Sequence, residues 1–234
     1  VIITAVIQSS SAVTVMLVGL VNSGIIEFGQ TISIVLGTNV GTTLTGWIMT
    51  LMGVSSDEFT IFSLVSPKVF VPILAFVGAV MRTFLKKEKS KDIGTILLGF
   101  SVLMYGMTIM SESMSVLTEL PEFKSLLTMF TNPILALVAS TVFTGIIQSS
   151  SAAIGIFQAL ALNGALTVEM AVPMVLGANI GTTITAILSA VGSNKSAKRV
   201  VVSHRFVNAI GAAVMMGIFM IYSNINQAYV LSTT

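Results

Sequence analysis

The chain has 234 residues, of which 54% are hydrophobic and 9% charged, and its formal net charge is +2 at pH 7. Soluble globular domains carry about 25% charged residues, so this chain could not cover its own surface with polar groups and is expected to be an integral membrane protein. The few Lys and Arg residues argue against nucleic acid as a partner, and the lack of cysteine excludes disulfides, thiol chemistry and cysteine metal sites.

Apolar segments follow one another along the chain, and a helix needs about 20 residues to span the bilayer core. Two of the segments, 1–23 and 126–163, are interrupted by the polar run QSSS, at 8–11 and 148–151. Each arm beside the run is too short to cross alone, so we expect two re-entrant helical hairpins whose tips are buried in protein or line a watery cavity. The segments expected to cross the membrane directly are 29–53, 60–85, 93–117, 167–191 and 200–223.

The distribution of charge orients these segments. If the first hairpin enters and leaves on one side, the crossings that follow place the Lys and Arg residues of 82–91 and 195–205 on that same side. The acidic residues at 57–58 and 119–122 then lie on the other side. The positive-inside rule makes the basic side cytoplasmic, so we expect a multi-pass protein of the cell (inner or plasma) membrane. The cytoplasmic loops are expected to be 86–92 and 192–199.

Two polar motifs occur twice in the chain, 140 residues apart. QSSSA at 8–12 returns at 148–152, and GTNVGTT at 37–43 returns as GANIGTT at 177–183. An odd number of crossings separates the two copies, so they are expected to face opposite ways in the membrane. This arrangement is the inverted repeat of secondary transporters, in which substrate sites form from broken helices near the bilayer midplane.

The repeat also divides the chain. Repeat 1, a hairpin and a broken helix, is assigned to 1–59, the linking helices with their basic loop to 60–125, and repeat 2 to 126–234. Asn132 and Pro133 open the second copy, before its QSSS. Because the counterpart of this pair would precede Val1, part of the first hairpin arm is expected to lie outside this chain.

The serine runs are candidate anion ligands. The second arm of each hairpin begins just after QSSS, and the start of a helix has free backbone N–H groups and a partial positive charge, which bind anions without Arg or Lys. Serine is also a preferred N-cap whose hydroxyl can donate to an oxyanion. Two such tips arriving from opposite faces would clamp a small tetrahedral anion. The predicted ligands are Ser9, Ser10, Ser11, Ser149, Ser150 and Ser151, together with Thr42 and Thr182.

The glycine motifs are candidate cation sites. Their Gly pairs are expected to interrupt a transmembrane helix in each copy. The carbonyls so exposed, with Asn side-chain oxygens, Thr hydroxyls and the Gln carbonyls of the tips, are hard ligands suited to Na⁺. Any one of these residues alone is more often a packing residue of a helix interface than a ligand, but their duplicated constellation favours a site. The predicted Na⁺ ligands are Gln8, Gln148, Thr38, Asn39, Asn179, Thr43 and Thr183, with no transition metal expected.

Two polar residues of the last apolar segment stand outside the repeated motifs. His204, the only histidine, is expected to have an interfacial or hydrogen-bonding role, with a proton relay as the alternative. Asn208, one helical turn deeper, is expected to bridge helices or, alternatively, to touch an ion.

The tandem QSSSA pair with GTNVGTT and GANIGTT resembles the type II sodium/phosphate cotransporter family, bacterial branch, over most of the chain. This resemblance implies Na⁺-coupled movement of inorganic phosphate, with both hairpins and the Asn-bearing breaks forming the site, and a homodimer in the lipid bilayer. We therefore predict a secondary active transporter that works by alternating access, with Na⁺ as coupling ion and no cofactor. Serine tips alone leave open another divalent oxyanion (sulfate, arsenate or a dicarboxylate), an anion channel or a phosphate sensor. An enzyme is not expected, since no nucleophile–base or metal-ligand set is visible.

Overall fold

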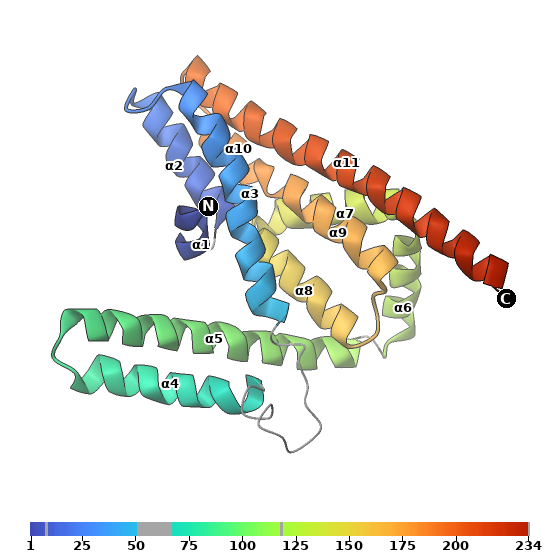
Figure 1. The fold of residues 1–234 in the computed structure, drawn as a ribbon, viewed down its shortest axis with the longest axis horizontal. Coiled ribbons are helices and arrows are strands. Elements are labelled where there is room, and N and C mark those ends of the chain that lie inside the picture. The colour runs from blue at the N-terminus through green and yellow to red at the C-terminus, as the bar shows by residue number, and fades with distance from the viewer. Residues whose placement is uncertain (8, 51–66, 118, 234) are drawn as a thin grey trace.

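The computed structural model describes residues 1–7, 9–50, 67–117 and 119–233, and every regular element in these ranges is a helix, as predicted (Figure 1). Gln8 and the predicted boundary at 59–60 lie outside the described residues. The helices are α1 (Ile2–Ile7), α2 (Ser10–Asn22), α3 (Phe28–Thr50), α4 (Pro67–Phe84), α5 (Glu88–Leu117), α6 (Pro121–Thr128), the 3₁₀ helix η3 (Met129–Thr131), α7 (Pro133–Ile147), α8 (Ser150–Leu162), α9 (Val168–Gly181), α10 (Thr183–Ser189) and α11 (Lys195–Thr233).

The two sequence copies adopt the same local structure. Helices α2 and α8 both have 13 residues and begin after a serine N-cap in extended conformation, with φ −145° and ψ 104° at Ser9 and φ −141° and ψ 107° at Ser149. Both helices are followed by a glycine with positive φ, 74° at Gly24 and 70° at Gly164. Glycine adopts this conformation without steric cost. The repeat in sequence is therefore a repeat of caps, helix lengths and turns.

The second copy shows how the polar run makes a helix–turn–helix. Asn132 caps the start of α7 with Pro133 in the first turn, as its place at the opening of this copy predicts. At the other end Gln148 takes the left-handed conformation (φ 59°, ψ 21°), and its N–H donates to the Thr144 carbonyl at 2.7 Å. The 15 residues of α7 and 13 of α8 reach about 22 Å and about 20 Å, short of the roughly 30 Å of a bilayer core.

The glycine motifs do not break the helices as predicted. Helix α3 runs without interruption through Gly37 and Gly41, so the expected break in the first copy is wrong. In the second copy only Thr182 separates α9 from α10, and its dihedral angles, φ −59° and ψ −24°, are helical. A glycine inside a helix costs about 1 kcal/mol, whereas each unpaired backbone group in lipid costs several kcal/mol. The hydrogen-bonded helix therefore persists.

The glycines instead allow close helix packing. A Cβ on Gly181 would lie 2.6 Å from the Thr141 carbonyl oxygen and 2.7 Å from the Thr144 Cβ. A Cβ on Gly41 would lie 2.6 Å from the Cβ of Thr4, the repeat counterpart of Thr144. Each motif thus has the Gly-x-x-x-Gly spacing that lets two backbones approach in membrane proteins. The motif of the first copy packs α3 against α1, and the motif of the second copy packs α9 against α7 in the same way.

Two buried clusters hold the helices together. One is formed by α2, α3, α10 and α11 and includes Leu17, Val35 and Val200, and the other lies within the second copy, between α7, α8 and α9, around Phe157 and Met174. Helix α11 contacts α2, α3 and α9, so it packs against both copies. In lipid, such association depends on close packing and polar contacts more than on removal from water.

Helices α4 and α5 form an antiparallel hairpin that lies beside the other helices and contacts α8 (Figure 1). Their backbones meet at Gly78 and Gly94, where a Cβ on either residue would come within 2.8 Å of the partner's carbonyl oxygen. Near the α4–α5 turn, Arg82 Nη1 donates to Thr95 Oγ1 at 2.9 Å. The predicted basic loop 86–92 is shorter in the structure, because only residues 85–87 lie between the two helices and residues 88–92 form the start of α5.

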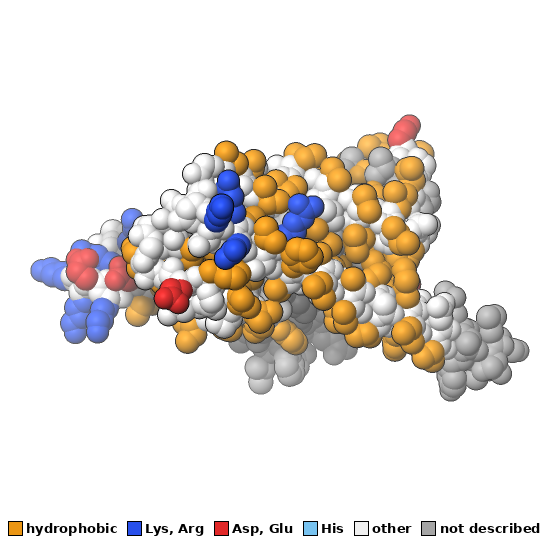
Figure 2. Space-filling view, turned by 90° about the horizontal axis from the view of Figure 1, so that it is seen from above, with side chains coloured by type: hydrophobic (Ala, Val, Ile, Leu, Met, Phe, Trp, Pro, Cys, Tyr) orange, Lys and Arg blue, Asp and Glu red, His pale blue; other side chains and the backbone are white. Residues whose placement is uncertain are grey.

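The outer surface suits lipid. Two helical stretches of the described residues are long and apolar enough to cross a membrane, Val168–Ser189 and Lys195–Ile225. The predicted crossings 29–53, 60–85 and 93–117 coincide over their described parts with α3, α4 and α5, and as crossings they stay predictions. Figure 2 shows apolar side chains over much of the visible face, with the Lys and Arg groups on its left and middle. Exposed apolar side chains include Phe76, Ile96, Val102, Phe206 and Ile218.

Candidate functional site

A small cavity lies where the tips of the two copies meet. Its volume is about 170 Å³, and all its lining residues are neutral and polar. They come from the starts of α2 and α8, the turn before α8 and the joint between α9 and α10. The lining residues of this serine pocket are Ser9, Ser10, Ser11, Gln148, Ser149, Ser150, Ser151 and Thr182. Every serine predicted as an anion ligand is therefore brought to one place.

The starts of α2 and α8 have hydrogen-bond donors that no group of their own helix accepts. Ser9 Oγ accepts from the Ala12 N–H at 3.1 Å, and Ser149 Oγ accepts from the Ala152 N–H at 3.2 Å. Because each oxygen acts as acceptor in its cap, the hydroxyl proton remains available for another acceptor. The first backbone N–H groups of α2 and α8 likewise have no intrahelical acceptor, and they carry the positive end of the helix dipole.

The size and burial of the serine pocket suit a small ion. Ser10, Ser11 and Ser150 are buried. The pocket volume of about 170 Å³ is smaller than the about 300–1,000 Å³ of sites for drug-sized ligands. Thr182 differs from the serines because its hydroxyl donates to the Ala178 carbonyl at 2.8 Å. It therefore offers the pocket oxygen lone pairs rather than a proton.

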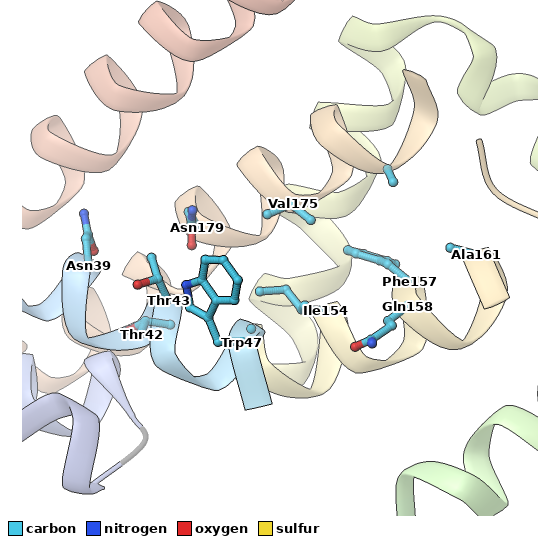
Figure 3. A pocket seen from close by; sticks show the side chains of 12 residues that line it. Asn39, Thr42, Thr43, Trp47, Ile154, Phe157, Gln158, Ala161, Val175 and Asn179 are labelled. Atoms are coloured by element: carbon cyan, nitrogen blue, oxygen red, sulfur yellow. The ribbon is translucent and has the colours of Figure 1, made fainter. Parts of the chain in front are cut away.

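A second cavity of about 540 Å³ lies between α3, α8 and α9 (Figure 3). One part of its wall is apolar, with Trp47, Ile154, Phe157 and Val175, and the other part is polar. The polar lining residues are Asn39, Thr42, Thr43, Gln158 and Asn179. We call this the asparagine cavity, because it brings together the equivalent asparagines of both copies.

The threonines of the asparagine cavity present oxygen lone pairs. Thr42 Oγ1 donates to the Thr38 carbonyl at 2.9 Å, and Thr43 Oγ1 donates to the Val40 carbonyl at 2.7 Å. Thr42 was predicted to join the anion ligands as the counterpart of Thr182, but it lines this cavity and not the serine pocket. The two threonines are equivalent in sequence and differ in surroundings.

The residues predicted to bind Na⁺ are only partly brought together. Asn39, Asn179 and Thr43 share the asparagine cavity, whereas Gln148 lines the serine pocket. Gln8 lies outside the described residues. Thr38 and Thr183 line neither cavity. Both are buried and donate to the backbone carbonyl three residues earlier, of Val35 and Ile180, each at 2.7 Å.

A buried hydrogen-bond network connects the two copies through α11. Asn208 Nδ2 donates to the backbone carbonyl of Asn179 at 3.1 Å and lies 3.1 Å from His204 Nε2, while Asn208 Oδ1 accepts from Asn39 Nδ2. His204 is fully buried and Asn208 is 5% exposed. The predictions that Asn208 bridges helices and that His204 has a hydrogen-bonding role are confirmed.

Sequence reasoning missed the part of the asparagine cavity that α8 supplies. Gln158 and Phe157 lie on the helix that follows the serine tip, and Trp47 lies on α3 beyond the glycine motif. A polar Gln158 within an apolar helix was the available signal. Phe157 and Trp47 carry no signal of this kind, because aromatic residues are ordinary in apolar helices.

These features, an all-helical chain with an apolar surface, repeated helical units and uncharged cavities lined wholly or partly by polar groups, are typical of membrane transporters. Comparison with known proteins agrees, since the family described as Na⁺/Pi-cotransporter matches the chain at residues 1–112 and again at 102–231. The chain belongs to this family, and the resemblance seen in its sequence is confirmed.

Curated relatives cover nearly the whole chain. "Uncharacterized protein YqeW" of Bacillus subtilis (strain 168) is 31% identical over 217 residues, and "Putative inorganic phosphate export protein YjbB" of Escherichia coli (strain K12) is 25% identical over 216. Both alignments take in 92% of this chain, which spans 66% of the first relative and 37% of the second.

A human relative matches over a shorter stretch. "Sodium-dependent phosphate transport protein 2B" of Homo sapiens is 34% identical over 101 residues, which are 41% of this chain and 15% of the relative. No solved structure matches the chain.

Proposed function

We propose that this chain moves inorganic phosphate across a membrane together with Na⁺, as a secondary active transporter. The observation that carries the proposal is the serine pocket, in which the repeated tips of both copies line one neutral cavity of about 170 Å³. Membership of the Na⁺/Pi-cotransporter family and the names of the E. coli and human relatives support phosphate as the anion.

Phosphate would be held by neutral donors. The hydroxyl protons of Ser9 and Ser149 and the first N–H groups of α2 and α8 supply charge-assisted hydrogen bonds to its oxygens, and the two helix dipoles favour its negative charge. A fixed Lys or Arg would bind phosphate more tightly. Hydrogen-bond donors without full charge let the anion leave, which transport requires as much as binding.

Na⁺ would be held by oxygen ligands in the asparagine cavity. The carboxamide oxygens of Asn39 and Asn179 and the lone pairs of Thr42 and Thr43 are ligands of the kind that Na⁺ accepts. Bringing an anion out of water into a site without a counter-charge is unfavourable. A co-bound cation offsets this cost, so that each ion improves binding of the other and their movements are coupled.

Alternating access would come from two re-entrant hairpins of inverted orientation. The inversion is supported by Figure 1, in which the turn between α2 and α3 lies at the upper left and the turn between α8 and α9 lies at the lower right. Related units that enter from opposite sides can expose one central site to either side by small rigid movements. The lipid bilayer and a second copy of the chain are the proposed partners.

The proposal is tested in liposomes that contain the purified chain. We expect uptake of radiolabelled phosphate driven by an inward Na⁺ gradient and absent when K⁺ replaces Na⁺. Excess sulfate, arsenate and a dicarboxylate are added in turn, because serine donors alone do not choose among oxyanions. Reversing the gradient measures export, the direction in the name of the E. coli relative.

Other outcomes would identify other functions. Phosphate flux that is equal in Na⁺ and K⁺ would indicate an anion channel. Binding of phosphate in detergent with no flux in liposomes would indicate a sensor. Either result would overturn Na⁺-coupled transport.

A further inference from the structure

We propose that Asn208 is a positioning residue that turns the side-chain oxygen of Asn39 into the asparagine cavity, so that a Na⁺ ligand of the first copy depends on the backbone of the second. This inference rests on the proposed function. Asn208 lies on α11, which packs on both α3 and α9, and it is 5% exposed. It belongs to neither the QSSS runs nor the glycine motifs.

The orientation of the Asn208 amide is fixed by a group that can only accept. Its partner in the second copy is the backbone carbonyl of Asn179, 3.1 Å from Asn208 Nδ2. A carbonyl cannot donate a hydrogen bond, so the nitrogen of Asn208 must face it. The Asn208 oxygen must then face α3.

The Asn208 oxygen in turn fixes Asn39. The group of Asn39 that faces Asn208 Oδ1 must be a donor, and Nδ2 of Asn39 occupies this place. The oxygen of the same carboxamide is therefore directed away from α11. Figure 3 shows the nitrogen of Asn39 toward α11 and its oxygen on the side of the other labelled residues of the asparagine cavity.

His204 is compatible with this arrangement. Its Nε2 lies 3.1 Å from Asn208 Nδ2, and this nitrogen has a second hydrogen to give besides the one bound to Asn179. A neutral ring can accept at Nε2 when its proton is on Nδ1, which has no hydrogen-bond partner among the described residues. If Asn208 flipped, its oxygen would face the Asn179 carbonyl and that bond would be lost, whereas His204 could still donate to the oxygen as its Nε2–H tautomer. The Asn179 carbonyl is therefore the group that fixes the amide.

The chain of contacts has a consequence for cation binding. If the Asn39 carboxamide were flipped, its N–H donors would face the cavity. These donors repel a cation, whereas the carboxamide oxygen binds one. Loss of Asn208 would free Asn39 to take both orientations and would weaken Na⁺ binding. The phosphate site would keep its own ligands, because no residue of this network lines the serine pocket.

Trp47 provides the measurement. It is the only tryptophan of the chain and lines the asparagine cavity with Asn39. We expect Na⁺, but not K⁺, to change the fluorescence of the purified full chain. In Asn208→Ala, the half-saturating Na⁺ concentration should rise by about 5-fold or more, as the loss of one or two hydrogen bonds predicts. The KM for phosphate at saturating Na⁺ should be unchanged.

Controls separate positioning from folding. Asn224→Ala removes an exposed amide from the same helix and should leave the Na⁺ titration unchanged. Asn208→Leu removes the hydrogen bonds without leaving a cavity and should reproduce the effect of Asn208→Ala. In an Asn39→Ala background, Asn208→Ala should have no further effect, which a general loss of structure would not produce.

Contrary outcomes are distinct for the two proposals. Equal Na⁺ titrations of wild type and both Asn208 variants, or additive effects of the Asn39 and Asn208 substitutions, would overturn the positioning role. A wild type without a Na⁺-specific fluorescence change would overturn it as well, because the cavity would then not bind Na⁺. A wild type that responds to Na⁺ and moves no phosphate would overturn only the proposed function.

Discussion

At the scale of single residues, neighbouring serines have different roles. Ser149 accepts a backbone N–H as N-cap and keeps its own proton free, whereas Ser150 is buried in the first turn of α8. The same holds for Ser9 and Ser10 in the first copy. The capping serine is therefore the side chain best placed to donate to an anion in the serine pocket.

Replacement of Ser149 tests this role. In Ser149→Ala we expect the KM for phosphate to rise by about 10-fold or more, since a hydrogen bond to a charged group contributes about 1.5–3 kcal/mol. Loss of the cap alone destabilises the helix by about 0.5–2 kcal/mol, so membrane insertion and yield are measured beside Na⁺-dependent uptake. Ser149→Thr keeps the hydroxyl and should retain more activity than the Ala variant.

Ser113→Ala is the matched control, because Ser113 is exposed on α5 and donates to the Ile109 carbonyl, outside both cavities. Its KM should equal that of the wild type. A Ser149→Ala protein with unaltered KM for phosphate would contradict the anion-binding role of the capping serine.

The cavity that each serine lines could be predicted from the sequence, as could that of Thr182, whereas the cavity that Thr42 lines could not. QSSS interrupts an apolar segment, and this local signal gave both the helix start and the place where the tips meet. Thr42 and Thr182 have equivalent neighbours in sequence, yet they line different cavities. Which cavity each threonine lines depends on how the two copies pack against one another. The two copies have similar sequences, but they do not pack symmetrically, so the sequence alone does not distinguish the two threonines.

At the scale of secondary-structure elements, the helix starts were predicted better than the helix interiors. Asn132 and the serine caps are chemical signals that fix where α7, α2 and α8 begin. The Gly pairs are ambiguous, because a broken helix and a close helix contact both favour glycine. Only the position of the neighbouring helix distinguishes the two, and here α1 and α7 lie directly against the glycines of α3 and α9.

A substitution at Gly181 tests the close contact. In Gly181→Ala the new Cβ would meet the Thr141 carbonyl and the Thr144 Cβ within 2.7 Å, so α7 must move away from α9. We expect the protein to lose about 1–3 kcal/mol of stability, as overpacking commonly costs, and its Tm in detergent to fall. Gly41→Ala should lower the Tm as well, because Thr4 lies equally close to it.

Gly211→Ala is the comparison, since a Cβ there has no neighbour within 4 Å on α11. Its Tm should be unchanged or slightly higher, because alanine favours a helix over glycine by up to about 1 kcal/mol. Equal Tm changes at Gly181 and Gly211 would mean that the glycine motifs are not packing contacts.

At the scale of the whole molecule, charge and repeat lead to the same topology. The backbone N–H of Asn194, directly before the basic start of α11, donates to Asn22 Oδ1 at 2.8 Å, and Asn194 Nδ2 donates to the Asn22 carbonyl at 3.1 Å. Asn22 is the last residue of α2. The end of α2 thus lies beside basic residues that the positive-inside rule assigns to the cytoplasm. The sequence predicted from charge only that these two segments lie on the same side of the membrane.

The inverted orientation is tested with single cysteines, for which the cysteine-free chain has no background. Glu27 and Thr167 are repeat counterparts, both exposed, in the turns that follow the two hairpins. We expect a membrane-impermeant maleimide to label Glu27→Cys only from the cytoplasmic side, and to label Lys89→Cys, in the first turn of α5, from that side as well. Thr167→Cys should be labelled only from the opposite side. Labelling of both from one side would mean that the serine tips enter from the same leaflet, and small opposed movements of the two copies could then not open the pocket to each side in turn.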